Sequence, residues 1–221
     1  MKMISGMTTV TSPISLAEQQ RIVMHDVSWD FYTRVLEEVG DENQRVTFDN
    51  GRLEIMSPLP EHEDVKKAVA RLLEAMADEL DLSLHGFGST TFCREDRQKG
   101  LEPDECYYLQ NEDKVRGMKR FDPAVHPAPD LAIEIDVFGR SVQREPIYAG
   151  LGVAELWRVN GGEITVKLLQ PDLTYAVAAK SRAFPFLPIE QFQKSVQRMA
   201  FERQTTVVRE FRQWVRSLPE L

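Results

Sequence analysis

Residues 127–138 read PAPDLAIEIDVF, a short apolar run in which carboxylates recur at even positions: Asp130, Glu134 and Asp136. Successive side chains of a β-strand alternate between its two faces, so the three carboxylates fall on one face and the aliphatic side chains on the other. Only Ala132 relieves the charge on the acidic face. Neighbouring like charges roughly 7 Å apart on one face repel each other, and burying them without partners is unfavourable.

A divalent cation would relieve this repulsion. Magnesium takes oxygen ligands, typically one or two carboxylates together with water and phosphate oxygens. The alternative is an edge strand whose acidic face is solvated. The stretch by itself leaves both interpretations open.

Composition limits the class of protein. The 221 residues suffice for one domain with a full hydrophobic core, which is simpler than two small domains. The chain has 27 Lys and Arg against 35 Asp and Glu, a net charge of −8, which argues against a protein that coats nucleic acid non-specifically. An enzyme that touches DNA at one cleft remains possible.

The sequence predicts a soluble, cytoplasmic protein. No apolar run approaches the roughly 20 residues that span a bilayer, and the N-terminus lacks a basic segment followed by an apolar core, so no membrane partner is expected. Cys93 and Cys106 belong to no CxxC or metal-ligand pattern and are predicted to be buried thiols.

Three segments are expected. Residues 1–20 lack apolar periodicity and predict a flexible leader, 21–190 a single α/β domain, and 191–221 a helical extension. Phe201, Val208, Phe211, Val215 and Leu218 recur at helical spacing in that extension. Such a stripe packs on the body of the protein or on a second copy, which makes a homodimer an expectation.

Three elements are predicted before the acidic run: a helix from Ser28 to Gly40, a hairpin of residues 45–49 and 52–56, and a long helix over 61–81. The hairpin rests on Asn50–Gly51, a strong two-residue turn signal between alternating strands.

The first turn of the long helix is acidic. Glu61, Glu63 and Asp64 there complement the helix dipole, which is the preferred explanation. The alternative is that Glu61 or Glu63 points to the same metal as the acidic strand. His62 is expected to be a hydrogen-bonding surface histidine rather than a ligand.

A second acidic stretch lies at residues 101–109, where Pro103–Asp104 begins a short apolar segment just as Pro129–Asp130 does later. Residues 110–126 between the two are polar, and four of them form a basic cluster: Lys114, Arg116, Lys119 and Arg120. An exposed loop or short helix is expected there, although a loop that contacts phosphates would look the same.

A strand-helix-strand unit follows. A helix beginning near Glu145 and strands over 154–159 and 163–169 are predicted after the acidic strand. The short crossover predicts that the acidic strand and 154–159 run parallel.

The carboxylates Asp104, Asp130, Glu134 and Asp136 thus lie at the ends and on the faces of short strands. A metal-dependent nuclease needs carboxylates that hold a divalent ion, which lowers the pKa of a bound water and neutralises charge on the phosphate. A nearby cation, often lysine, stabilises the transition state. Here no lysine follows the acidic strand until Lys167.

Five motifs in order resemble the Uma-two-like putative restriction endonuclease family: EIMSPLPEHE (54–63), GSTTF (88–92), LEPDECYY (101–108), PDLAIEID (129–136) and IYAGLGVAELW (147–157). The resemblance covers roughly residues 25–170. It implies the PD-(D/E)xK nuclease fold, a restriction-endonuclease-like α/β core in which a mixed sheet is flanked by helices, here with an N-terminal hairpin and a C-terminal helical tail.

The resemblance also implies site residues. Asp104 matches the first aspartate and Glu134 the (D/E) residue, while Asp136 stands where the superfamily pattern has its lysine. Asp130 and Asp136 are then outer or alternative metal ligands, as is Glu61 or Glu63 on the helix. Many relatives carry a lysine four residues before the tyrosine matching Tyr148, and this chain has Arg144 there.

By this resemblance the protein is a Mg²⁺- or Mn²⁺-dependent DNA endonuclease with Asp104, Glu134 and Arg144 as catalytic residues. Arginine supplies positive charge but cannot give up its proton, so Arg144 is an electrophilic cation and not a base. Glu134→Ala is then expected to abolish cleavage and leave the fold intact. Two alternatives stay open: an inert binding or regulatory module with the nuclease fold, and a metal-dependent hydrolase of small phosphoesters.

Overall fold

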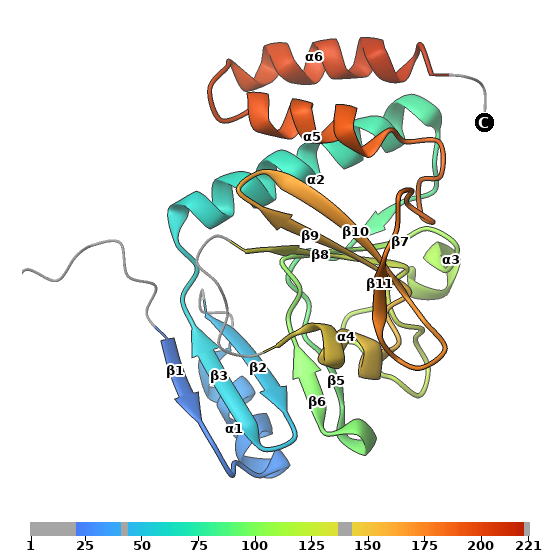
Figure 1. The fold of residues 1–221 in the computed structure, drawn as a ribbon. Helices are drawn as coiled ribbons and strands as arrows, with labels where there is room; N and C mark the ends of the chain where they lie inside the picture. The colour runs from blue at the N-terminus through green and yellow to red at the C-terminus, as the bar shows by residue number, and fades with distance from the viewer. Residues whose placement is uncertain (1–20, 41–43, 137–142, 219–221) are drawn as a thin grey trace, which may run out of the picture.

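The structure, a computed structural model, describes residues 21–40, 44–136 and 143–218 (Figure 1). The N-terminal sheet has the order β1-β3-β2-β6-β5, with β1 Arg21–Met24, β2 Arg45–Asp49, β3 Arg52–Met56, β5 Phe92–Arg94 and β6 Lys99–Leu101. The main sheet has the order β11-β10-β9-β8-β7-β4, with β4 His85–Gly86, β7 Glu105–Tyr108, β8 Leu131–Ile135, β9 Glu155–Asn160, β10 Glu163–Leu169 and β11 Tyr175–Val177.

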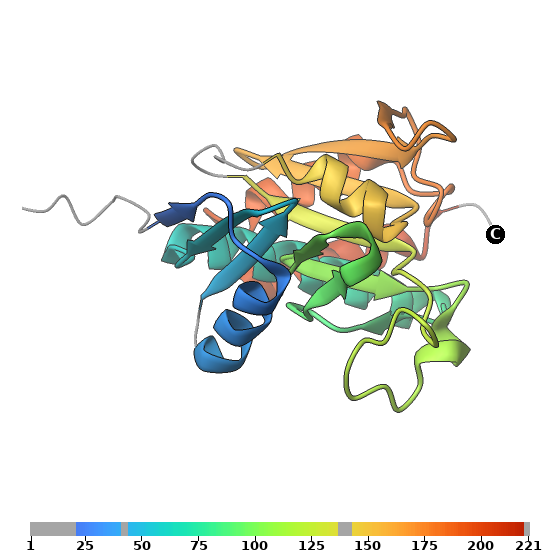
Figure 2. The same cartoon turned by 90° about the horizontal axis from the view of Figure 1, so that it is seen from below.

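Helices cover both faces of the main sheet. The helices in the described ranges are α1 Trp29–Val39, which packs on the N-terminal sheet, α2 Pro60–Leu80, α3 Glu112–Val115, α4 Glu145–Leu151, α5 Ile189–Arg198 and α6 Gln204–Val215, with a 3₁₀ turn at Glu95–Arg97. Helices α2, α5 and α6 lie on one face, whereas α4 lies on the other, next to the N-terminal sheet (Figures 1 and 2). The expected α/β class, a mixed sheet flanked by helices with an N-terminal hairpin and C-terminal helices, is confirmed. No helix in these ranges is long and apolar enough to cross a bilayer.

The acidic strand, β8, lies in the middle of the main sheet. It pairs antiparallel with β7 and parallel with β9, so that Ile133 stands opposite Glu105 on one side and Trp157 on the other. All five of its residues are buried. An edge strand with a solvated acidic face is therefore wrong. The predicted parallel unit of β8, α4 and β9 is confirmed.

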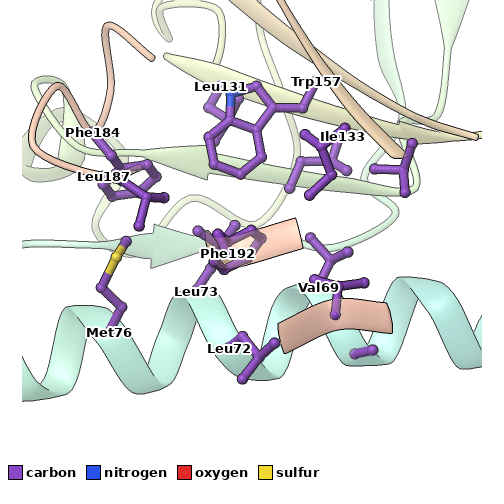
Figure 3. Close-up of a cluster of buried hydrophobic side chains, with 14 of the residues drawn as sticks. Val69, Leu72, Leu73, Met76, Leu131, Ile133, Trp157, Phe184, Leu187 and Phe192 are labelled. Atoms are coloured by element: carbon purple, nitrogen blue, oxygen red, sulfur yellow. The ribbon is translucent and has the colours of Figure 1, made fainter. Parts of the chain in front are cut away.

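The two faces of β8 meet different layers. Leu131, Ile133 and Ile135 belong to the main hydrophobic core, where they join Trp157 and the side chains of α2 and α5 (Figure 3). Ala132 instead packs in the cluster that includes residues of α4. The predicted alternation of faces is thus confirmed for the described part of the run, while Val137 lies outside it. The face that carries Glu134 is the face that meets α4.

The local signals near the N-terminus are confirmed. The Ser28 side chain accepts a hydrogen bond from the Phe31 amide at 3.2 Å, and Gly40 ends α1 with a positive φ of 55°. The hairpin turns at Asn50 and Gly51, whose φ angles of 46° and 85° suit a type I′ turn. Strand β1 was not predicted, because four residues at a sheet edge carry no clear period.

Between α2 and β6 the chain forms the two-residue β4 and the three-residue β5. One expectation about the tail needs correction. Phe201 does not join the apolar stripe of the tail, because it lies in the turn between α5 and α6 and is 91% exposed. The rest of the stripe packs on α2 and contributes Phe211 and Val215 to the main core. The stripe is therefore used within the chain and gives no support to a homodimer.

Half of the basic cluster in 110–126 has local partners. Lys114 donates to the Asn111 side chain at 2.7 Å, and Arg116 forms a two-pronged pair with Glu112, its closest contact being 2.6 Å. These contacts are of the kind expected in an exposed loop.

Glu79 fastens α6 to α2. Its two carboxylate oxygens accept hydrogen bonds from Arg216 and Arg212, with closest distances of 2.5 and 2.6 Å. These bonds lower the pKa of Glu79 from 4.5 to about 2. A carboxylate with a depressed folded-state pKa stabilises the fold above its unfolded pKa and loses that contribution as the pH falls through the folded value.

We therefore expect Glu79→Gln to be less stable than the wild type at pH 6, with a difference that shrinks between pH 5 and pH 2. Urea unfolding across this range measures it. Glu61→Gln is the control, because Glu61 is an exposed carboxylate at the other end of the same helix. A pH-independent difference for Glu79→Gln, or the same pH-dependent difference in the control, would contradict the assignment.

Candidate active site

Glu134 is held by two residues of the α4 segment. The side chain is 3% exposed, and its Oε1 accepts a hydrogen bond from Arg144 Nη1 at 2.8 Å and another from the Tyr148 hydroxyl. Arg144 is the N-cap residue of α4 and Tyr148 lies one turn further on, so positions four apart reach the same oxygen. The α4 segment therefore fixes the orientation of this carboxylate.

The protonation states of these partners follow from burial and charge. Burial opposes the charge on Arg144, but attraction by Glu134, together with smaller contributions from Tyr148 and Asp104, outweighs burial and raises the pKa of the guanidinium. Burial, followed by the negative charge of Glu134, raises the pKa of Tyr148 well above its usual value. At neutral pH Arg144 is thus a cation and Tyr148 a hydrogen-bond donor.

Arg144 retains donors for another ligand. Its Nη1 also donates to the Glu102 carbonyl at 3.1 Å. Its Nε and Nη2 are buried and make no hydrogen bond to any residue in the described ranges. Buried donors without partners are unfavourable, and an anionic oxygen such as that of a phosphate would satisfy them.

Asp104 lies against the same end of β8. It is fully buried, its Oδ2 accepts the Ile135 amide at 2.7 Å, and its own amide donates to the Ile133 carbonyl at 3.2 Å. The two backbone contacts flank Glu134 in the sequence. The structure therefore brings Asp104 and Glu134, predicted from distant motifs, to one stretch of strand.

His62 joins Asp104 from the first turn of α2. The imidazole Nε2 lies 3.1 Å from Asp104 Oδ2, and the side chain is 3% exposed. The expectation of a surface histidine is wrong, because the side of this turn that carries His62 faces the end of β8, whereas Glu61 in the same turn is exposed. Arg45 of β2 also reaches Asp104, with its Nε 3.9 Å from Oδ1.

Of the two helix acids, Glu63 lies in this cluster and Glu61 is exposed. Glu63 Oε1 lies 3.8 Å from Arg45 Nη2, and its Oε2 lies 3.5 Å from Lys66 Nζ. Arg45 also contacts Glu102 at 3.3 Å. Burial raises the pKa of Glu102, and the charge of Arg45 opposes that shift. Arg45 thus links the N-terminal sheet to the acids beside β8.

Asp130 lies at the opposite end of β8 from Asp104. Four residues of strand, roughly 13 Å, separate it from Glu134. Its carboxylate accepts hydrogen bonds from the Leu109 amide at 2.8 Å and from the Asn111 amide and side chain at 3.1 and 2.6 Å. These hydrogen bonds stabilise the turn that follows β7.

Asp136 follows β8 and faces a cleft. Its Oδ2 is paired with Arg158 Nη2 at 2.7 Å. The cleft, of about 100 Å³, is lined by Glu134, Asp136, Gln143, Arg144, Glu145, Leu156 and Arg158. Carboxylates and guanidinium groups thus share its walls, a combination that suits a phosphate bound beside a metal ion.

The donor set fits a magnesium-type ion with few protein ligands. No three Asp, Glu, His or Cys side chains within residues 21–40, 44–136 and 143–218 are grouped as a ready-made metal site. Mg²⁺ does not need such a cage, because it keeps several waters and binds through one or two carboxylates. Asp104 and Glu134 can supply these two, with Arg144 competing for Glu134.

Sequence reasoning missed His62, Arg45 and the role of Tyr148. Tyr148 stood within a family motif, and its position four residues after Arg144 was a usable signal. Arg45 had none, since it occupies an ordinary polar position of a hairpin strand.

The chain is similar to a known protein family and to a solved structure. The model of the Uma2 family, described as "Putative restriction endonuclease", matches residues 29–200. A solved structure, described as a putative nuclease belonging to DUF820 from Anabaena variabilis, resembles the chain with a TM-score of 0.41 and 13% identity, over 77% of this chain and 90% of that one. The search of curated proteins gave no match. Because the family model covers most of the chain, the protein belongs to the Uma2 family of putative restriction endonucleases.

Proposed function

We propose that the protein is an endonuclease that hydrolyses phosphodiester bonds in DNA with the help of Mg²⁺ or Mn²⁺. The observation that carries the proposal is the convergence of Asp104 and Glu134, both buried, on one end of β8. Glu134 opens on a cleft that Arg144 also lines. Family membership supports the same reaction class.

In this proposal Asp104 and Glu134 would hold the divalent ion, which would lower the pKa of a bound water and supply positive charge to the phosphate. Arg144 binds a phosphate oxygen through its remaining donors and stabilises the charge that develops there. Tyr148 keeps Glu134 in one orientation. Arg144 cannot accept the proton of the attacking water, because guanidinium does not deprotonate in proteins.

The remaining acidic residues differ in how closely they are associated with the proposed metal site. Asp136, on the cleft wall, and Glu63, next to His62 and Arg45, are the nearer outer ligands. The hydrogen bonds of Asp130 and the exposure of Glu61 favour structural roles for these two.

A second candidate is a nuclease-fold module that binds nucleic acid without turnover. It is favoured by the contact between Glu134 and Arg144, because a permanently charged arginine replaces the metal's charge at this carboxylate. Under this alternative the buried pair is a structural substitute for the ion.

Incubation with supercoiled plasmid and linear duplex DNA tests the proposal, in 5 mM Mg²⁺, Mn²⁺ or EDTA. We expect nicked or linear product with either metal and none in EDTA. DNA binding without product would move the protein to the second candidate. Hydrolysis of bis(p-nitrophenyl) phosphate with intact DNA would indicate the small-phosphoester hydrolase.

A further inference from the structure

A basic groove runs along α6 beside α2. It has a volume of about 280 Å³ and is lined by Arg71, Thr205, Val208, Arg209, Arg212, Gln213 and Arg216. Four of the seven residues are arginines and none is acidic, in a chain whose net charge is −8. We propose that this groove binds the phosphate backbone of DNA at a place separate from the cleft.

The groove and the cleft lie on different sides of the molecule. Helix α6 lies in the layer that covers one face of the main sheet, whereas α4, with Arg144 and Tyr148, lies on the other face (Figure 1). DNA in the groove is therefore held by a contact distinct from the one at the cleft. The inference rests on the proposed function in one respect, which is that the polyanion bound in the groove is taken to be DNA.

The arginines of the groove are positioned and still have donors to offer. Arg212 and Arg216 are paired with Glu79, and Arg212 also with Asp78 at 3.1 Å, whereas Arg71 Nη1 donates to the neutral Gln204 side chain at 3.1 Å. Neither Arg71 nor Arg209 has an ion-pair partner within the described ranges. Guanidinium groups bind phosphate through paired N–H donors, so two of these side chains are available for new partners.

The spacing along α6 suits a repeating anion. Residues 205, 209, 212 and 216 recur every three or four positions and so share one face of the helix. The three arginines among them, at 209, 212 and 216, span about 10 Å of helix, which lets them contact neighbouring phosphates of one strand. A row of charges that repeats along a groove favours a backbone over a single bound phosphate.

A protein partner fits less well. Protein interfaces are dominated by buried aromatic or aliphatic anchors, and Val208 is the single apolar side chain that lines the groove. The other lining residues are four guanidinium groups, a hydroxyl and an amide, all of which can donate hydrogen bonds to phosphate oxygens. The chemistry of the groove thus favours a polyanion.

DNA binding measured by fluorescence anisotropy tests the inference. The probes are a fluorescein-labelled 30-base-pair duplex and one of its strands alone. Measurements are made in EDTA from 50 to 300 mM NaCl, so that no cleavage is needed. For Arg71→Gln/Arg209→Gln we expect the dissociation constant to rise roughly tenfold per arginine at 0.1 M salt, and the slope of log K against log salt on the duplex to fall by about 1.8. Arg209→Lys should keep the slope.

Arg34→Gln on α1 is the matched control, because it removes one exposed arginine far along the chain from the groove. Unchanged affinity and slope in the double variant would overturn the inference. The inference would also be overturned if the double variant changed in molar mass by light scattering but not in DNA binding. That result would assign the groove to an acidic protein surface.

Failure of the groove inference can be distinguished from failure of the nuclease proposal. The double variant should still hydrolyse a six-base-pair duplex at the wild-type rate, because the catalytic cleft is untouched. If the wild type binds DNA through the groove but never cleaves it, the nuclease proposal fails and the groove assignment stands.

Discussion

Replacing Glu134 by glutamine is expected to reduce metal-dependent DNA cleavage more than about 100-fold. Residues that only orient metal ligands alter affinity or activity by about 10- to 100-fold, so a direct ligand should exceed that range. Glutamine keeps the size of the side chain and an oxygen that accepts from Arg144 and Tyr148. The loss would therefore report the missing carboxylate charge and not a collapsed site.

Initial rates on supercoiled plasmid in Mn²⁺ measure this effect. Glu145→Gln is the control in the same cleft: Glu145 lines it but is paired with Lys167 at 2.6 Å. We expect that variant to lose less than about tenfold. Cleavage by Glu134→Gln at the wild-type rate would remove Glu134 from the mechanism.

Replacing Glu134 by alanine is expected to lower the free energy of unfolding by about 3–5 kcal/mol. The change leaves Arg144, which is 5% exposed, buried without the carboxylate that balances it. This alters the expectation from sequence that Glu134→Ala would spare the fold. Glutamine is the better substitution for the activity assay because its side-chain oxygen still accepts from Arg144 and Tyr148. Urea unfolding followed by circular dichroism gives the values.

A double variant separates charge imbalance from other causes. Glu134→Leu/Arg144→Met removes both charges and keeps most of the volume, and such replacements of buried pairs are often neutral or stabilising. We expect it to recover most of the stability lost in Glu134→Ala. Arg158→Met breaks a partly exposed pair with Asp136 and should cost about 1 kcal/mol or less. A double variant less stable than Glu134→Ala would contradict a simple charge imbalance.

The elements that sequence predicted well are those set by local chemistry. The Asn50–Gly51 turn, the cap at Ser28 and the apolar period of α2 each act within a few residues, and all are present in the structure. The βαβ unit followed from the handedness and length of its crossover. Strand β1 was missed because its pairing with β3 is a long-range contact that a four-residue segment does not announce.

Site residues whose role follows from a family motif could be predicted from the sequence. Residues that reach the site only because of how the chain folds could not. Asp104 and Glu134 came from two motifs, and the antiparallel pairing of β7 with β8 brings them together. The burial of His62 depends on how the first turn of α2 meets β8, and the contact of Arg45 depends on how the two sheets approach each other. Asp130 and Asp136 fall on the same predicted face of the strand as Glu134, yet Asp130 precedes β8 and Asp136 follows it.

The existence of a metal site at Asp104 and Glu134 is tested most directly by calorimetric titration of Mn²⁺ into the wild type and into Glu134→Gln, with circular dichroism to verify that both are folded. We expect saturable binding near one ion per chain in the wild type and binding at least tenfold weaker in the variant. Absence of Mn²⁺ binding by the wild type, with and without DNA, would contradict the metal site and leave the pair of Glu134 and Arg144 as a structural substitute for the ion.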